Sequence, residues 1–367
     1  MLSFISNSEW PPPRAWKLTI GGALLTLLAF VATTEIILAR RGFAPTVHDT
    51  QALWLKERER ASALGKRALI LVGASRIQLD IDLDILRRTT GLEPVQLAID
   101  GSSYVPVLEG LAHDPSIRGT VVLDLIPGPV SLERQSSGAS HDFQAEYETS
   151  ADGKIRWPTY RDIDARMSDA MRNHLINYAD GGRPWDAFQN RIINPEATPQ
   201  YLSTFADRSR RADYQRVKMP DFYLSRVLRH LGNPPEIDTS LPADRLAQKV
   251  EDYVSRLEPT AASAQTTKGL VDLERTVAAI QSRGGKVIIV SLPTSGLVHE
   301  ADTRRFPKSL YWDRVAATTS AHAIHSQEHP ELSRFACPDG SHLDQRDVPA
   351  FTTAFVRAAG LGLDRSP

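Results

Sequence analysis

Short apolar runs that end in small residues recur along the chain. The runs are 68–75 (ALILVGAS), 95–103 (VQLAIDGSS), 119–128 (GTVVLDLIPG) and 286–295 (KVIIVSLPTS). An uninterrupted apolar stretch of this length is typical of a strand that is buried on both faces of a parallel sheet. We therefore predict four buried strands, with polar and small residues at their carboxyl ends.

Segments with helical periodicity lie between and after these runs. They are the charged stretch 50–66, the amphipathic stretch 270–285 with its Gly-Gly stop, and the last periodic segment, 348–359. A Gly pair after a periodic segment is a common helix terminator. Strands that alternate with helices indicate right-handed βαβ units, so we predict an α/β fold with a parallel sheet and helices on both faces.

The stretch 131–267 interrupts this alternation. It is rich in Arg, Asp and Tyr, and its apolar positions recur at helical spacing in pieces such as 222–231, between Pro- and Gly-containing breaks. We predict that it is a helical insertion into the α/β domain. Its basic run 208–218 is typical of a solvated helix face, although a surface for an anionic ligand is the alternative.

The first forty residues have a different character from the rest. Residues 18–39 form a 22-residue apolar run with Glu35 as its single charge, and Trp16-Lys17 and Arg40-Arg41 flank it. At about 1.5 Å per residue, this run is long enough to cross a hydrocarbon core of roughly 30 Å. A cleaved signal peptide is the alternative, but its apolar core is usually about 7–15 residues long and ends in small residues. We expect an uncleaved transmembrane helix, with Glu35 near the membrane edge.

These patterns divide the chain into six parts. They are an N-terminal tail (1–17), a transmembrane helix (18–39), a linker and helix (40–66), the first part of the α/β domain (67–130), the helical insertion (131–267) and the second part of the α/β domain (268–367). Because basic residues flank both ends of the apolar run, the charge distribution leaves the orientation in the membrane open.

Composition excludes several classes of protein. The 367 residues carry 43 Lys+Arg against 44 Asp+Glu, a formal charge of −1, with 41% hydrophobic and 24% charged residues. These are values of a folded, water-soluble body, and they lack the positive field of a general nucleic-acid binder. The single cysteine, Cys337, excludes an internal disulfide framework and is more typical of a small packed hydrophobic residue than of a nucleophile.

No cofactor or metal site is predicted. The sequence contains neither G-x-x-x-x-G-K-[ST] nor G-x-G-x-x-G, the phosphate-binding glycine patterns. His322, His325 and His329 are spaced H-x-x-H-x-x-x-H, but no neighbouring residue completes a known ligand set, so we interpret them as surface histidines. The alternating Asp80, Asp82 and Asp84 indicate an exposed first turn of a helix, where negative charge is favourable.

Three clusters of polar residues point to chemistry at one edge of the predicted sheet. Ser75 directly follows the first strand in the sequence Gly-Ala-Ser-Arg, Gly101 follows the second in Asp-Gly-Ser-Ser, and Asp339 precedes His342 by three residues before the last helix. Ligands of open parallel sheets bind at the carboxyl ends of the strands. A serine hydroxyl needs a base to become a nucleophile, and an imidazole oriented by a carboxylate supplies one.

A serine at the end of the first strand, with D-x-x-H before the last helix, resembles the SGNH (GDSL-like) hydrolase superfamily. The chain most resembles its membrane-anchored branch, whose members modify cell-envelope polymers, as in alginate O-acetylation and teichoic-acid D-alanylation. The resemblance covers roughly 68–125 and 270–360 and implies a flavodoxin-like parallel sheet. It also implies that Ser75 is the nucleophile, His342 the base and Asp339 its orienting acid.

The resemblance further implies an oxyanion hole formed by the backbone amides of Ser75 and Gly101. The chain departs from the family pattern in two places. Its first motif reads GASR where the hydrolases have G-D-S, and no Asn follows the third strand, where the family has a side-chain amide donor. Loss of one oxyanion donor typically costs about 10²–10³ in rate. Further candidates for contacts with the substrate are Arg76, Ser102, Ser103, Arg304 and Arg305.

On this basis we expect a membrane-anchored serine esterase or O-acyltransferase that uses an acyl-Ser75 intermediate. By the resemblance, the substrate is an acyl ester, with acetyl as the expected group, of an envelope or exported polysaccharide. A membrane-bound O-acyltransferase is the expected partner, and the body lies on the periplasmic side of the cytoplasmic membrane. The alternative is a catalytically inactive envelope protein of the same fold that binds polysaccharide or assists such an acyltransferase. The missing Asn favours this alternative, whereas the intact Ser75, Asp339 and His342 favour the enzyme.

Overall fold

The computed structural model of the chain describes residues 13–128, 130, 138–151, 171, 174–181, 183–261 and 264–362. The chain forms two compact units, one made of residues 1–47 and 159–200 and the other of residues 48–158 and 201–367. Most of the expected N-terminal tail and part of the expected insertion lie outside the described residues.

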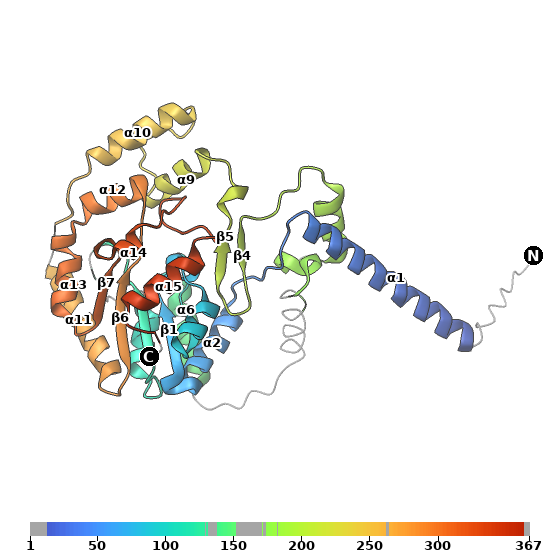
Figure 1. The fold of residues 1–367 in the computed structure, drawn as a ribbon, viewed down its shortest axis with the longest axis horizontal. Helices are drawn as coiled ribbons and strands as arrows, with labels where there is room; N and C mark the ends of the chain where they lie inside the picture. The colour runs from blue at the N-terminus through green and yellow to red at the C-terminus, as the bar shows by residue number, and fades with distance from the viewer. Residues whose placement is uncertain are drawn as a thin grey trace, which may run out of the picture. The chain divides into compact units, whose positions relative to one another are not determined.

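The larger unit contains a five-stranded parallel sheet (Figure 1). Its strands are β1 (Ala68–Val72), β2 (Glu93–Gln96), β3 (Thr120–Asp124), β6 (Lys286–Ser291) and β7 (His322–His325). They pair in the order β2-β1-β3-β6-β7. The predicted α/β class and parallel sheet are therefore confirmed. The fifth strand, β7, was not predicted: two histidines in its four residues hide it as a strand.

Helices cover both faces of the sheet, as the βαβ pattern predicted. Alternate residues of β1 divide between two apolar cores: Ile70 faces one core and Leu71 the other. One core contains residues of α2 (Gln51–Leu64), α5 (Val105–His113), α11 (Ala264–Gln281) and α13 (Trp312–Thr318), with α6 (Ala139–Ala151) packed beside α2 and α5. The other core contains residues of α3 (Ser75–Leu79), α4 (Leu83–Thr90), α14 (Pro330–Ser333) and α15 (Val348–Ala358).

Part of the expected insertion packs on this body and differs from a purely helical one. It contains the antiparallel pair β4 (Leu202–Thr204) and β5 (Arg210–Ala212), followed by η4 (Tyr214–Arg216), α9 (Asp221–His230) and α10 (Ala243–Ser255). Helices α9 and α10 form a third apolar core with α12 (Gly296–Arg305). The expected solvated helix face is wrong at Arg208: this residue lies on the β4–β5 turn, is fully buried and pairs with Asp49 at 2.6 Å. Three short helices complete the body, η1 (Gly65–Arg67), η5 (Lys308–Leu310) and η6 (Ser326–Glu328).

The smaller unit is built on α1 (Pro13–Arg40), whose residues 16–40 are long and apolar enough to cross a membrane. Within 176–193, the described residues of the expected insertion add three short helices to this unit, namely η2 (Ile176–Gly181), α8 (Pro184–Ala187) and η3 (Phe188–Ile193). Contacts of α1 with η2 and η3 hold them together. The stretch predicted as one insertion is thus shared between the two units, a division that no periodicity in the sequence signals.

Candidate active site

Ser75 stands where the chain leaves β1 and begins α3. The turn between them requires Gly73, which has a φ of +149°. A Cβ at this position would lie 3.0 Å from the Cβ of Asp124, at the end of the neighbouring strand. Glycine therefore permits both the backbone conformation and the close approach of β1 and β3. The serine is consequently fixed at the carboxyl edge of the sheet, the edge at which ligands of parallel sheets bind.

The D-x-x-H segment folds as a tight turn around the carboxylate of Asp339. Its Oδ1 accepts hydrogen bonds from the backbone N–H groups of Ser341 at 2.9 Å and His342 at 2.8 Å. Gly340, between Asp339 and Ser341, has a φ of +91°, and a Cβ at this position would lie 2.4 Å from Cγ2 of Val298. The three-residue spacing thus lets one carboxylate oxygen hold the backbone, while the other faces the imidazole of His342.

A continuous hydrogen-bonded relay connects the three side chains singled out in the sequence. His342 Nδ1 lies 2.8 Å from Asp339 Oδ2, and His342 Nε2 lies 2.9 Å from Ser75 Oγ. Ser341 Oγ also lies 3.0 Å from His342 Nδ1. With Nδ1 protonated towards Asp339, Nε2 can accept the proton of Ser75. This is the arrangement that a serine nucleophile, its general base and an orienting acid require.

Asp339 is buried and has two more polar neighbours, which sequence reasoning missed. Arg226 on α9 donates to its Oδ2 at 3.2 Å, and the hydroxyl of Tyr214 hydrogen-bonds to it. Burial alone would raise the pKa of Asp339, but hydrogen bonds from His342, Ser341 and Tyr214 outweigh burial and lower that pKa far below its usual range. The carboxylate therefore stays ionised and can stabilise an imidazolium ion at His342.

A buried ion pair, Arg76–Asp124, stands beside the relay. The guanidinium of Arg76 contacts the carboxylate of Asp124 through Nη2 at 2.8 Å and Nε at 3.2 Å. The side chains are 6% and 0% exposed. Arg76 was expected to contact substrate, but its guanidinium pairs with Asp124 in the interior of the fold. Asp124 occupies the end of β3, the region where the family pattern places an Asn.

Asp80 corrects a second expectation, because it is fully buried and not part of an exposed helical turn. Its Oδ1 accepts the backbone N–H of Leu343 at 2.8 Å, directly after His342. Asp82 and the exposed Asp84 do begin α4, as expected. Burial raises the pKa of Asp80 well above its ordinary value, and the nearby Arg76 only partly opposes this.

Replacing Asp80 by asparagine should make stability less sensitive to pH. A raised carboxyl pKa means that the folded state binds the proton of Asp80 more tightly than the unfolded state does. Protonation of Asp80 therefore stabilises the fold fully below the unfolded pKa, near 3.8, and this contribution is lost as the pH rises through the folded pKa. The introduced amide keeps an acceptor for Leu343 without this penalty. The melting temperature of Asp80→Asn relative to the parent should rise as the pH is raised above about 4, as measured by thermal unfolding in detergent. Asp84→Asn, on the surface of α4, is the control; a pH-independent difference for Asp80→Asn would refute the prediction.

The loop after β2 reaches the same edge of the sheet. The N–H of Ile99 donates to the carbonyl of Gly73 at 3.2 Å, which brings residues 99–101 beside the turn that carries Ser75. Gly101 has a φ of +64°. Asp100 pairs with Arg210 at 2.6 Å; burial would raise the pKa of Asp100, but this contact outweighs burial and lowers it. Ser103 Oγ accepts the N–H of Val105 at 3.2 Å and caps α5. Ser102 is half-buried on this loop.

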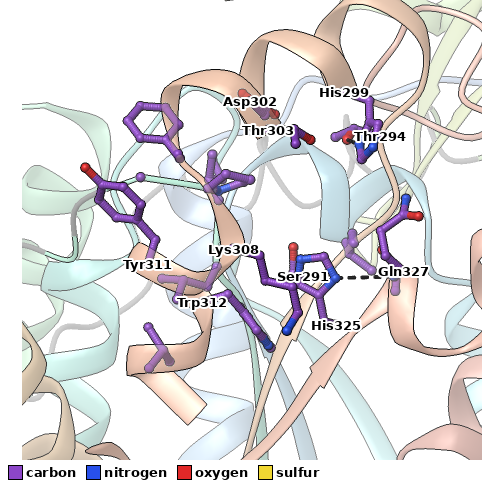
Figure 2. A pocket seen from close by; sticks show the side chains of 18 residues that line it. Ser291, Thr294, His299, Asp302, Thr303, Lys308, Tyr311, Trp312, His325 and Gln327 are labelled. Atoms are coloured by element: carbon purple, nitrogen blue, oxygen red, sulfur yellow. Dashed lines mark hydrogen bonds between the residues drawn. The ribbon is translucent and has the colours of Figure 1, made fainter. Parts of the chain in front are cut away.

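A separate cavity of about 220 Å³ opens at the carboxyl ends of β3, β6 and β7 (Figure 2). Ser291 at the end of β6 and Thr294 just after it line the cavity together with His325 and Lys308. Burial lowers the pKa of His325 to about 4, so its imidazole is neutral near pH 7. Lys308 bonds to Glu328 at 2.7 Å and also to Asp313. The cavity is lined mainly by apolar side chains, with the neutral imidazole of His325 and the charges of Lys308 and Asp302, each paired with another residue, among its polar groups.

The remaining sequence candidates are not part of either site. Arg304 pairs with Glu300 at 3.0 Å on the surface of α12, and Arg305 lies 5.1 Å from the ring centre of Phe306. Cys337 is buried, and burial raises the pKa of its thiol. Both observations are typical of a packed residue and not of a nucleophile.

A sequence signal existed for the partnership of Asp124 with Arg76, but none existed for Arg226. Arg76 and Asp124 are opposite charges at the carboxyl ends of adjacent buried strands, and such charges must pair. Arg226 lies 113 residues before Asp339 in the chain, and no motif links the two.

Comparison with known proteins adds no assignment: no family model matches the chain, and no curated protein shows significant similarity to it.

Proposed function

We propose that the protein is a membrane-anchored serine esterase or O-acyltransferase of the SGNH type. The observation that carries the proposal is the relay from Ser75 Oγ through His342 to Asp339, with distances of 2.9 Å and 2.8 Å, at the carboxyl edge of a parallel sheet. The strand order supports a flavodoxin-like assignment, because the five strands counted along the chain pair in the order 2-1-3-4-5.

The proposed reaction forms and then breaks an acyl-Ser75 ester. As Ser75 Oγ attacks the ester carbonyl carbon, His342 Nε2 accepts its proton, and the backbone N–H groups of Ser75 and Gly101 are the candidate donors to the oxyanion. His342 then gives the proton to the leaving alkoxide. Water or a sugar hydroxyl, deprotonated by His342, attacks the acyl-enzyme and releases Ser75. Asp339 stabilises the imidazolium in both halves of the reaction.

The proposed substrate is an acyl ester, acetyl in the first instance, of a cell-envelope or exported polysaccharide. This part rests on the family resemblance, as do a membrane-bound O-acyltransferase as partner and a body on the periplasmic side of the cytoplasmic membrane. Helix α1 supports the membrane anchor, because residues 16–40 have the length and apolarity of a membrane span. A tethered enzyme would remain close to a polymer that is leaving the bilayer.

The test is covalent labelling of the full chain, in native membranes, with a fluorophosphonate probe. We expect labelling of the parent and complete loss of the label in Ser75→Ala and His342→Ala, because the probe reacts only with an activated serine. Ser341→Ala is the matched control: Ser341 also contacts His342, at 3.0 Å, yet its loss should leave the label in place. Absence of label on a folded parent, or label that persists in Ser75→Ala, would refute the proposal.

A second candidate function is a non-catalytic envelope protein that binds polysaccharide or assists an acyltransferase. One observation favours it: the end of β3 carries Asp124, locked to Arg76 at 2.8 Å, in the region where the family pattern has an amide donor. Without that donor, a rate lower by about 10²–10³ is expected unless another group replaces it. A folded parent that resists the probe but binds acetylated polysaccharide would favour this candidate.

A further inference from the structure

Glu35, the single charge in the apolar part of α1, does not project freely from the helix. Its carboxylate accepts hydrogen bonds from the backbone N–H groups of Ile176 at 2.6 Å and Asn177 at 3.1 Å, and from Asn177 Nδ2 at 2.6 Å. These donors lie in the first turn of η2, where backbone N–H groups lack partners within the helix. The contact therefore supplies hydrogen-bond partners both to the carboxylate of Glu35 and to the backbone N–H groups at the start of η2.

The segment 176–193, made of η2, α8 and η3, is also fixed to α1 by aromatic and basic residues. The ring of Phe30 lies 5.5 Å from that of Phe188 and 6.5 Å from that of Trp185. At the other end of the contact, Arg41 Nη1 donates to the carbonyls of Arg191 and Ile192, both at 2.9 Å. The segment consequently covers the last third of α1, from Phe30 to Arg41.

The depth of this contact follows from the length of α1. A hydrocarbon core of about 30 Å takes roughly 20 helical residues, so a span that begins at Leu18, just after Trp16-Lys17, ends near residue 37. Glu35 then lies about 3 Å inside the boundary and Phe30 about 10 Å inside it, at 1.5 Å per residue. A bare carboxylate at this depth is costly, and the donors of η2 offset that cost.

The segment also carries exposed apolar side chains. Trp185 is 57% exposed and lies beside Phe30 of α1. Ile193 is 61% exposed and follows Ile192, whose carbonyl accepts a hydrogen bond from Arg41. On α1 itself, Leu25 is 71% exposed. Tryptophan is enriched at membrane interfaces, and amphipathic elements insert about 5–10 Å into the region between headgroups and acyl chains. The exposed Arg41 bonds to the backbone carbonyl of Arg191 just beyond the end of the helix, where the guanidinium of Arg41 can reach the headgroups.

We propose that segment 176–193 lies in the membrane interface against α1, with Trp185 and Ile193 in contact with lipid acyl chains. The proposal rests on the membrane anchor of the proposed function, and it goes beyond it by assigning a second membrane-embedded element. The partner surface is the lipid bilayer, because Trp185 lies beside Phe30 of α1, within the depth that α1 itself spans, and both Trp185 and Ile193 are exposed.

Spin-label depth measurements on the full chain in phosphatidylcholine–phosphatidylglycerol vesicles test this proposal. The single native thiol is replaced (Cys337→Ala), and nitroxides are attached to Trp185→Cys and Ile193→Cys. Leu25→Cys is the lipid reference, and Asp84→Cys, on the exposed surface of α4, is the water reference. We expect the ratio of oxygen to nickel-chelate accessibility at 185 and 193 to approach that at 25 and to be several-fold higher than at 84, because oxygen partitions into lipid and the chelate does not.

The outcomes separate this proposal from the one on which it rests. A water-like ratio at 25 means that α1 does not insert, and the anchor fails together with the inference. A lipid-like ratio at 25 with water-like ratios at 185 and 193 overturns the inference alone. Low accessibility to both reagents at 185 and 193 overturns it in favour of a protein partner. In Glu35→Leu, the label at 185 should shift towards water while the label at 25 stays; an unchanged depth at 185 refutes the role of Glu35.

Discussion

Replacing Asp339 by asparagine should lower kcat/KM for hydrolysis of an activated acyl ester by about 10⁴-fold, with little change in fold. The amide oxygen of the introduced side chain can still accept the N–H groups of Ser341 and His342, which bond to Oδ1 at 2.9 Å and 2.8 Å. Its NH₂ group would then face His342 Nδ1. The imidazole would have to accept at Nδ1 and carry its proton on Nε2, where it could no longer take the proton of Ser75.

Arg226 strengthens this expectation, because its Nε–H also points to Oδ2 of Asp339, at 3.2 Å. In the variant, two donors would meet there. Hydrolysis of p-nitrophenyl acetate by the detergent-solubilised full chain gives the rate, and circular dichroism reports the fold. Asp344→Asn is the matched control, since Asp344 belongs to the same loop and pairs with Arg346 at 2.6 Å. Equal losses in the two variants, or an active Asp339→Asn, would contradict the assigned role of Asp339.

Replacing Arg76 by alanine should destabilise the protein by about 3–5 kcal/mol, because it leaves the carboxylate of Asp124 buried without a partner. Asp124 is fully buried, and burial raises its pKa even in the presence of Arg76. Loss of the guanidinium removes the main opposing interaction. Urea unfolding of the solubilised chain, followed by circular dichroism, measures the change.

Two further variants test whether the uncompensated charge is the cause. The double replacement Arg76→Met with Asp124→Leu should recover most of the lost stability, because well-packed apolar side chains often match a buried ion pair. Arg87→Ala removes a pair with Asp84 whose side chains are 40% and 62% exposed, and it should cost less than about 1 kcal/mol. A loss in Arg76→Ala no larger than in Arg87→Ala would show that Asp124 does not depend on this partner.

The sheet was predictable because β1, β3 and β6 are buried on both faces and therefore appear as continuous apolar runs. The strand boundaries were less predictable than the strands themselves. The run 95–103 predicted a strand, whereas β2 covers Glu93–Gln96. The chain beyond Gln96 still bonds to β1 and its turn, through Leu97 and Ile99, but it has already left regular pairing. Strand β7 escaped prediction because it lies at the sheet edge and pairs only with β6, so few of its residues need be apolar.

The turn that carries Ser75 and the spacing of Asp339 and His342 follow from local sequence. The contact of His342 with Ser75 spans 267 residues and follows from the parallel sheet, whose strand ends share one edge. The supports of these side chains come from far along the chain. Arg226 reaches Asp339 across 113 residues, and Glu35 meets Asn177 across 142. Contacts of this kind depend on how separate segments pack together, and a single sequence contains no periodic signal for them. The same reason explains why Asp80 was expected in an exposed turn: its burial is set by the loop that carries Leu343.

The position of Cys337 gives the protein a built-in reporter of local opening. This thiol, the only one in the sequence, is 3% exposed and lies two residues before Asp339, with its Sγ 3.3 Å from the carbonyl of Pro293. A thiol reagent can reach it only when the loop that carries Asp339 and His342 swings away from the end of β6. The rate at which thiol reagents modify the native protein therefore reports how often the loop opens and the hydrogen bonds of the relay break. This local opening is otherwise measured by hydrogen exchange.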